Sequence, residues 1–116
     1  MYPGTHALQH PDKPCFIMAG TGETVTFAQY EAAANRCAHL LRRQGLQRLD
    51  HIAIFMENHP RYLELCGAGE RAGVYYTCIN SYLTAEELAF IVNDSQSKVL
   101  FTSQARRDVA LEAIKH

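Results

Sequence analysis

Three short apolar runs, separated from one another by segments with helical spacing, constrain the fold of this chain more than any other feature. The runs are His51–Met56 (HIAIFM), Val74–Ile79 (VYYTCI) and Lys98–Thr102 (KVLFT). The first run is nearly unbroken and is typical of a strand buried on both faces, and the second, rich in β-branched and aromatic residues, predicts another buried strand. The third run predicts a further strand. Because the strands alternate with helices, the sequence predicts an α/β fold with an open, mostly parallel sheet and helices on both of its faces.

The longest helix is predicted to begin at Phe27 and to stop at Gly45. Thr26 and Gln29 form a capping box, in which each side chain satisfies a free backbone N–H of the first turn. Apolar residues then recur three or four positions apart, which indicates one buried stripe. Before this helix, Cys15–Ala19 and Glu23–Thr26 flank a Gly-Thr-Gly turn. These two segments predict a short β-hairpin ahead of the sheet.

Three further helices are expected between and after the strands. One runs over Pro60–Ala72, with proline at the tolerated first position and Gly73 as its stop. The next opens with a second capping box, formed by Thr84 and Glu87. The last begins near Ser103, after the third apolar run. The order of the three strands in the sheet does not follow from one sequence.

Length and charge exclude several classes of protein. A chain of 116 residues has the size of one domain, and 11 basic against 12 acidic residues leave no excess charge for phosphates. A nucleic-acid binder is therefore not expected. No apolar run approaches the ~20 residues of a transmembrane helix. Residues 1–14 form a Pro-flanked start that we expect to be mobile. They show neither the basic nor the apolar region of a secretory signal, so we expect the protein in the cytoplasm.

Cysteine and histidine spacing predicts neither a disulfide framework nor a metal site. No C-x-x-C pair occurs, and each cysteine lies in an apolar stretch, so we expect buried, reduced thiols at Cys15, Cys37, Cys66 and Cys78. His6 and His10 are four residues apart but lie in the expected mobile start. They are a weak basis for metal binding, and no metal is predicted.

The run Gly67–Gly73 (GAGERAG) is the most tempting motif, because it resembles a dinucleotide fingerprint. Such a fingerprint needs its first glycines between a strand and a helix N-terminus, where backbone N–H groups meet a pyrophosphate. Here the run falls in the C-terminal half of a predicted helix, which is the wrong pole for an anion. We therefore expect small residues for close packing. The Ala19–Glu23 turn lacks the G-K-[ST] ending of a phosphate loop and joins two strands.

No catalytic residue is predicted either. Ser81, Ser95 and Ser103 lack a G-x-S-x-G elbow. The carboxylates fall mostly in predicted caps, turns and solvated helix faces; they are Asp50, Glu57, Glu64, Glu70, Glu86, Glu87 and Asp94. Tyr75 and Tyr76 are adjacent on a strand and must point to opposite faces, so only one of them could line a pocket.

An ordered series of segments is more informative than any single motif. Together they resemble the opening of an adenylate-forming enzyme, and Val25–Tyr30 and Arg71–Asn80 are similar to the first two core motifs of that superfamily. The other segments, in the same order, are His10–Pro14, Ala34–Arg36 with Leu40–Leu41, Asn58–Tyr62, Leu83–Leu88, Asn93–Ser95 and Lys98–Leu100. The resemblance covers roughly residues 9–105, and Tyr75–Asn80 is most similar to fatty-acid CoA ligases. Two positions depart from the pattern: Gly69-Glu70 replaces an apolar pair, and Cys78 replaces a proline.

The resemblance implies a ligase that works in two steps. A fatty or related carboxylic acid reacts with ATP and Mg²⁺ to give an acyl-adenylate and pyrophosphate, and CoA then displaces AMP. The superfamily uses a Ser/Thr/Gly-rich phosphate loop ending in lysine, a Tyr-Gly-x-Thr-Glu segment, a ribose-binding Asp and a lysine of a mobile C-terminal domain. None of these matches a position among the 116 residues. The resemblance therefore assigns no catalytic, cofactor-binding or metal-binding residue to this chain.

Residues 1–116 are accordingly expected to be the N-terminal α/β subdomain of an acyl-CoA synthetase, with the phosphate-loop region and the C-terminal domain absent. The subdomain alone should be inactive. Its partners would be the remainder of the synthetase, the acid, ATP and CoA, and an apolar face without its neighbour would favour self-association. The alternative is a stand-alone α/β binding or interaction module that never catalyses a reaction.

Overall fold

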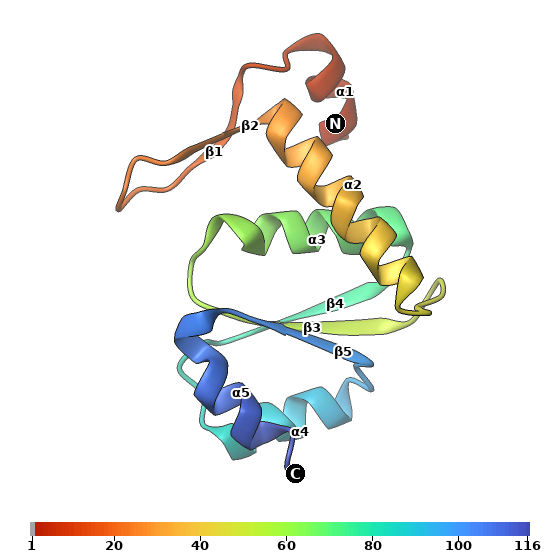
Figure 1. The fold of residues 1–116 in the computed structure, drawn as a ribbon, viewed down its shortest axis with the longest axis vertical. Helices are drawn as coiled ribbons and strands as arrows, with labels where there is room; N and C mark the ends of the chain where they lie inside the picture. The colour runs from red at the N-terminus through yellow and green to blue at the C-terminus, as the bar shows by residue number, and fades with distance from the viewer. Residues whose placement is uncertain (1) are drawn as a thin grey trace.

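A parallel sheet with helices on both faces forms the larger part of the molecule (Figure 1). The computed structural model describes residues 2–116. The strands lie in the order β4-β3-β5 and are all parallel; their bounds are β3 His51–Phe55, β4 Tyr75–Ile79 and β5 Val99–Thr102. The expected α/β class, with a mostly parallel sheet, is confirmed. The strand order, which the sequence could not give, places β3 in the centre.

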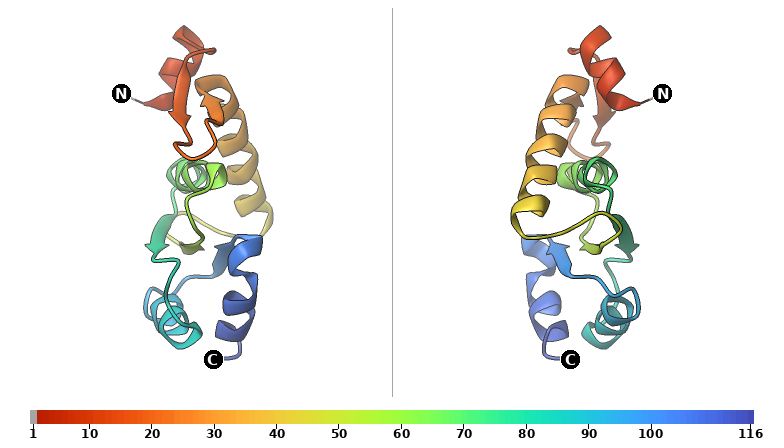
Figure 2. Two further views of the ribbon diagram at one scale, coloured as in Figure 1. Left: turned by 90° about the vertical axis from the view of Figure 1, so that its left-hand side faces the viewer. Right: turned by 90° about the vertical axis from the view of Figure 1, so that its right-hand side faces the viewer.

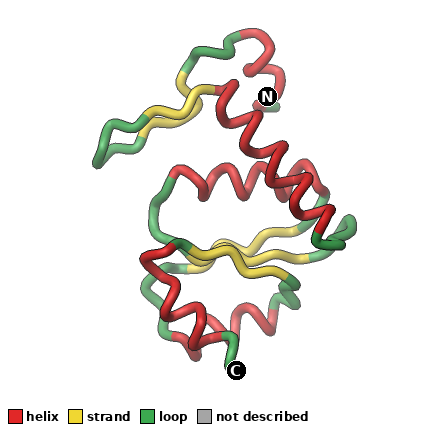
Figure 3. Tube along the Cα trace, viewed as in Figure 1, coloured by secondary structure: helices red, strands yellow, loops and turns green. Residues whose placement is uncertain are grey.

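The helices divide between the two faces, as Figure 3 shows for the three layers. On one face α3 packs on the sheet, and α2 crosses over α3; on the other face lie α4 and α5 (Figure 1). Their bounds are α2 Phe27–Arg43, α3 Pro60–Ala72, α4 Ala85–Asp94 and α5 Arg107–Ala113, with a 3₁₀ turn η1 at Gln104–Arg106 before α5. Both predicted capping boxes are present, so local signals placed α2 and α4 correctly.

The core is continuous through the central strand. Ile52 and Ile54 point to the face of α2 and α3, whereas Ala53 and Phe55 point to the face of α4 and α5. All four are fully buried, as expected for a strand covered on both sides. Val74–Ile79 was predicted to be buried in the same way, and this is wrong. Because β4 is an edge strand of the sheet, Tyr75 and Cys78 are exposed, the two residues between them are half-buried, and only Ile79 is buried.

The N-terminal segment lies apart from the sheet. Figure 2 shows the hairpin and α1 at one end of the elongated molecule, with α4 and α5 at the other. The predicted hairpin is present, with β1 (Pro14–Ile17) antiparallel to β2 (Thr24–Thr26). The sequence did not predict α1 (Pro3–Gln9), a helix of two turns within residues 1–14. The His6 ring of this helix stacks on Phe27 with ring centroids 4.9 Å apart, which attaches α1 to the start of α2.

The four cysteines are free thiols, but the expectation that they are buried is wrong. Cys15, Cys37 and Cys66 are half-buried, and Cys78 is exposed. For Cys78 the reason is again the strand order: an apolar neighbourhood in the sequence does not protect a side chain on the edge strand β4. Within residues 2–116 no helix is long and apolar enough to cross a bilayer.

Candidate functional site

The chain makes a groove where the carboxyl ends of β3 and β5 lie side by side. From β3 the chain turns to α3 on one face of the sheet, and from β5 it turns to η1 and α5 on the other (Figure 1). Such a switch in direction opens a crevice at the strand ends, which is where open α/β sheets bind ligands. The groove encloses about 450 Å³; its lining is Cys37, Met56, Glu57, His59, Arg61, Glu64, Leu65, Phe101, Thr102, Ser103, Gln104 and Ala105.

Glu57 and Ser103 join the two strand ends across the groove. Glu57 lies two residues beyond the end of β3 and Ser103 directly follows β5, and the Ser103 Oγ–H donates to Glu57 Oε2 at 2.5 Å. This hydrogen bond is the main cause that lowers the pKa of Glu57; a backbone hydrogen bond and the positive charge of Arg106 act in the same direction. Glu57 is therefore an ionised hydrogen-bond acceptor at neutral pH. A carboxylate with a lowered pKa is also a weak general base.

The start of α3 supplies the charged side of the groove. His59 is the N-cap, and its Nδ1 accepts from the backbone N–H of Arg61 at 3.1 Å. Arg61 Nη1 in turn donates to Glu64 Oε2 at 3.2 Å. Glu64 is 6% exposed and is the one buried charged residue in the described part of the chain. From its place in the sequence, Glu64 was expected among the carboxylates of caps, turns and solvated helix faces, whereas the structure shows it in a buried position.

The groove combines an apolar floor with a polar rim. Met56, Leu65 and Phe101 provide apolar surface, and Glu57 and Arg61 provide opposite charges near its mouth. This combination suits an organic group that carries a polar end. The hydroxyl of Ser103 faces a carboxylate with a lowered pKa, which is a weak base. The arrangement can bind and position a group.

The glycine run Gly67–Gly73 lies inside α3 and serves packing, as the sequence analysis inferred. A Cβ at Gly67 would lie 2.3 Å from Tyr30 Oη, and one at Gly69 would lie 2.9 Å from Tyr76 Cδ1. The first glycine admits a side chain of α2 and the second admits one of β4. Gly73 ends the helix with a φ of 74°, the left-handed conformation that favours glycine. Side chains of the protein thus occupy the space that a phosphate would need.

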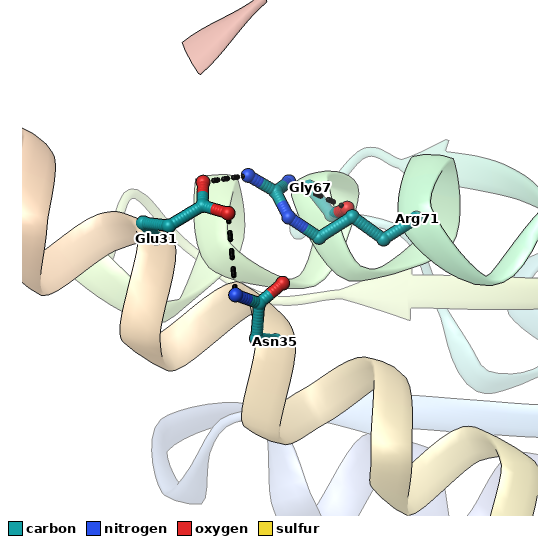
Figure 4. Close-up of polar contacts among 4 residues, drawn as sticks. All are labelled: Glu31, Asn35, Gly67 and Arg71. Carbon is teal, nitrogen blue, oxygen red and sulfur yellow. Dashed lines mark hydrogen bonds and ion pairs between the residues drawn. The ribbon is translucent and has the colours of Figure 1, made fainter. Parts of the chain in front are cut away.

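Arg71, which is part of this run, ties α3 to α2. Figure 4 shows its guanidinium between the Glu31 carboxylate, with which it forms an ion pair, and the Gly67 carbonyl, to which Nη1 donates at 3.0 Å. Glu31 also accepts from Asn35 Nδ2 at 3.2 Å (Figure 4). The guanidinium carbon lies 5.5 Å from the centre of the Tyr30 ring, within range of a cation–π contact. The run is therefore a helix junction rather than a nucleotide site.

Metal-ligating side chains do not gather in the part of the chain that the structure describes. No group of three or more His, Cys, Asp or Glu side chains in residues 2–116 could hold a metal ion. His6, one member of the histidine pair considered above, packs against Phe27 instead.

Glu57, Glu64 and Ser103 were not predicted from the sequence to form a group. The signal that could have found Glu57 and Ser103 is their position, since each is one of the first polar residues after a strand. That position predicts a shared site only when the two strands are known to be neighbours, and strand order was missing. For Glu64, helical spacing from Arg61 was visible, but its burial depends on how α2 covers α3.

Known proteins similar to this chain include an enzyme family named for AMP binding and relatives named for long-chain fatty acids. The model of the AMP-binding enzyme family matches residues 4–116. Long-chain fatty acid transport protein 1 of Bos taurus is 38% identical over 92 residues, 79% of this chain and 14% of that protein. Long-chain-fatty-acid–CoA ligase FadD13 of Mycobacterium tuberculosis is 34% identical over 94 residues, 81% of this chain and 19% of that protein.

Solved structures agree with these matches. The inhibitor-bound N-terminal domain of FACL13 from Mycobacterium tuberculosis superposes with a TM-score of 0.88 at 31% identity, over 97% of this chain and 28% of that one. A benzoate CoA ligase from Burkholderia xenovorans superposes with a TM-score of 0.91 at 20% identity and so shows the same fold, over 98% of this chain and 23% of that one. The chain thus spans less than a third of each of these relatives.

Proposed function

The chain belongs to the AMP-binding enzyme family, and from this premise we propose that it forms the N-terminal part of an acyl-CoA synthetase. The observation that carries the proposal is the family match over residues 4–116, nearly the whole chain. The name of FadD13 supports a fatty acid as the substrate. The chain corresponds to 19% of that relative, so the activity proposed is that of the longer protein.

The reaction proposed for the longer protein has two steps. A carboxylate oxygen of a fatty or related acid attacks the α-phosphate of ATP, which forms an acyl-adenylate and releases pyrophosphate. The thiol of CoA then attacks the acyl carbon and releases AMP, which leaves a thioester. Mg²⁺ would offset the charge of the phosphates. The glycine run of α3 does not fit a site for those phosphates, because Tyr30 and Tyr76 fill the space beside its glycines.

Within that enzyme this chain would act as a scaffold. The sheet and α3 hold the groove at the ends of β3 and β5, and Glu57 and Ser103 fix the two strand ends relative to each other. We infer that the phosphate loop and the lysine that act on ATP belong to other parts of the enzyme.

The activity is tested with the product of the complete reading frame. Purified protein is supplied with ATP, Mg²⁺, CoA and a series of fatty acids of different chain length, and pyrophosphate and acyl-CoA are measured. We expect both products to form in equal amounts with at least one acid. The matched control is the chain of residues 1–116, for which we expect neither product. Absence of ATP-dependent acyl-CoA formation with every acid would count against the ligase and favour a stand-alone binding module.

Nucleotide binding by the short chain is a separate measurement. If the ATP site belongs to the rest of the enzyme, isothermal titration of ATP into residues 1–116 should give no saturating heat at micromolar concentrations. Micromolar binding would show that the chain itself contains a nucleotide site.

The cytoplasm is the compartment that we propose. All four cysteines are free thiols, which is typical of proteins in a reducing compartment. We also propose that residues 1–116 associate with themselves when isolated, because large apolar side chains such as Phe90 and Ile114 are about 70% exposed at one end of the molecule. A single monomeric species in sedimentation at high protein concentration would contradict this.

A further inference from the structure

Helix α3 and the edge strand β4 place two cysteines side by side. Tyr76 of β4 lies against α3. A Cβ at Gly69 would be 2.9 Å from the Tyr76 ring, and the Tyr76 hydroxyl donates to Glu70 Oε1 at 3.0 Å. Cys78 lies two residues beyond Tyr76 and therefore faces the same helix. Cys66 lies one turn before Gly69, on the side of α3 that faces this strand.

The packing around Ile54 supports the same juxtaposition. Cys78 is the register partner of Ile54 in the sheet. Cys66 packs against the buried cluster that contains Ile54. The two thiols thus approach one buried side chain from the strand and from the helix. They differ in access to solvent, since Cys78 is exposed and Cys66 is half-buried.

The ionisation of the neighbouring groups is consistent with direct contact. Burial, followed by the charge and the hydrogen bond of Cys78, raises the pKa of Cys66 to about 12. The pKa of Tyr62, one turn earlier on α3, is raised by burial and then by the neighbouring Cys78. The titratable groups that face Cys66 are Cys78 and Tyr76 from β4 and Tyr62 and Glu70 from α3.

We propose that Cys66 and Cys78 are a redox-sensitive thiol pair that closes to an intrachain disulfide by exchange with a small disulfide such as oxidised glutathione. The exposed Cys78 thiolate attacks one sulfur of glutathione disulfide, which forms a mixed disulfide and releases one glutathione thiolate. The Cys66 thiolate then attacks the sulfur of Cys78 and releases the second glutathione. Two protein thiols are oxidised and one glutathione disulfide is reduced to two thiols. The pair does not depend on the ligase activity proposed above.

The order of attack follows from access and from ionisation. Cys78 is exposed, so glutathione disulfide can reach its thiol, whereas Cys66 is half-buried on the side of α3 that faces β4. Because only the thiolate attacks, a thiol with a pKa of about 12 closes the ring slowly at neutral pH. The closing step should accelerate about tenfold for each pH unit between about pH 7 and 9, since the thiolate fraction grows tenfold per unit far below the pKa.

Mass spectrometry of the alkylated protein tests the proposal. Reduced chain is incubated with oxidised glutathione at a series of pH values, quenched with acid and mapped by peptide. We expect a transient glutathione adduct at Cys78, followed by a peptide that links residues 66 and 78. In Cys66→Ser the adduct should persist on Cys78, and in Cys78→Ser the thiol of Cys66 should react at least tenfold more slowly. The double variant C15S/C37S, which leaves the pair intact, should close at the rate of the unaltered chain.

Three results would overturn the proposal. The first is a stable adduct on Cys78 with no linked peptide at any pH. The second is reaction of Cys66 in Cys78→Ser at the rate of the unaltered chain, which would show that Cys78 is not the entry point. The third is a closing rate that does not rise between pH 7 and 9. A measurement in concentrated urea is the control for the fold, and there the selectivity for the pair should be lost in favour of mixed pairings that include Cys37.

Discussion

The contact between Gly67 of α3 and Tyr30 of α2 gives the sharpest prediction for stability. In Gly67→Ala the new Cβ would lie 2.3 Å from Tyr30 Oη and 2.9 Å from its Cζ. Tyr30 is 7% exposed, and its ring is held between Arg71 and the edge of Phe16. The ring therefore cannot swing into solvent, and α2 and α3 must separate instead.

Two opposing effects determine the magnitude. Alanine in a helix interior is about 1 kcal/mol more favourable than glycine. Forcing an additional methyl group into a packed interior costs about 1–3 kcal/mol, and moving the Tyr30 ring also weakens its cation–π contact with Arg71, worth about 1 kcal/mol. Overpacking is the larger effect, so we expect Gly67→Ala to lower the free energy of unfolding by about 1–2 kcal/mol.

A double-mutant cycle isolates the clash. Tyr30→Phe removes the hydroxyl oxygen nearest to the new Cβ, so in that background Gly67→Ala should cost about 1–2 kcal/mol less. Urea unfolding followed by circular dichroism gives the four free energies, and an unchanged m-value shows that the native state is intact. Gly20→Ala is the matched control, because nothing lies within 4 Å of its Cβ position. The reasoning would be refuted if Gly67→Ala changed the free energy of unfolding equally in both backgrounds. It would also be refuted if Gly67→Ala stabilised the parent chain by the full amount of about 1 kcal/mol expected of alanine in a helix.

Three further substitutions test other contacts. Thr26→Ala removes the capping side chain of α2 and should cost about 1 kcal/mol in urea unfolding; an unchanged midpoint would show that the cap is dispensable. Arg71→Met leaves Glu31 without its cation and should lower the free energy of unfolding by about 2 kcal/mol. Adding Glu31→Gln to this variant should restore part of the loss, whereas additive losses from the two substitutions would exclude coupling between the residues. Ser103→Ala removes the main cause that lowers the pKa of Glu57. Because the pKa of Glu57 is lower in the folded state than in the unfolded state, its ionised form stabilises the fold. This contribution is fully present above the unfolded pKa of about 4.3 and is lost as the pH falls through the folded pKa. As the pH falls from about 5 to below the unfolded value of about 4.3, stability should therefore fall less in Ser103→Ala than in the parent chain. Identical acid slopes in this range would contradict the role of the hydrogen bond.

Elements with local signals could be predicted from the sequence. The capping boxes at Thr26 and Thr84 and the stop at Gly73 depend on neighbours within four residues, and the structure has all three where the pattern placed them. The central strand was equally clear, because a strand covered on both faces needs an unbroken apolar run. The helix α1 had no such signal: it is short and has no side-chain cap.

Features that depend on strand order could not be predicted. The runs of β3 and β4 look alike, but only β3 is central, so the burial of β4 and of Cys78 was overestimated. The same gap hid the groove, because Glu57 and Ser103 are 46 residues apart and meet only when β3 and β5 are neighbours. The burial of Glu64 likewise depends on the packing of α2 over α3, which no local pattern describes.

The coding sequence that follows the codon for His116 tests the central claim most directly. If the chain is the first part of an AMP-forming acyl-CoA synthetase, the reading frame continues into a Ser/Thr/Gly-rich loop that ends in lysine, followed by the Tyr-Gly-x-Thr-Glu segment. Sequencing the full transcript from its source measures this without any assumption about folding or activity. A stop codon directly after His116 would contradict the claim, and the chain would then be a complete α/β module.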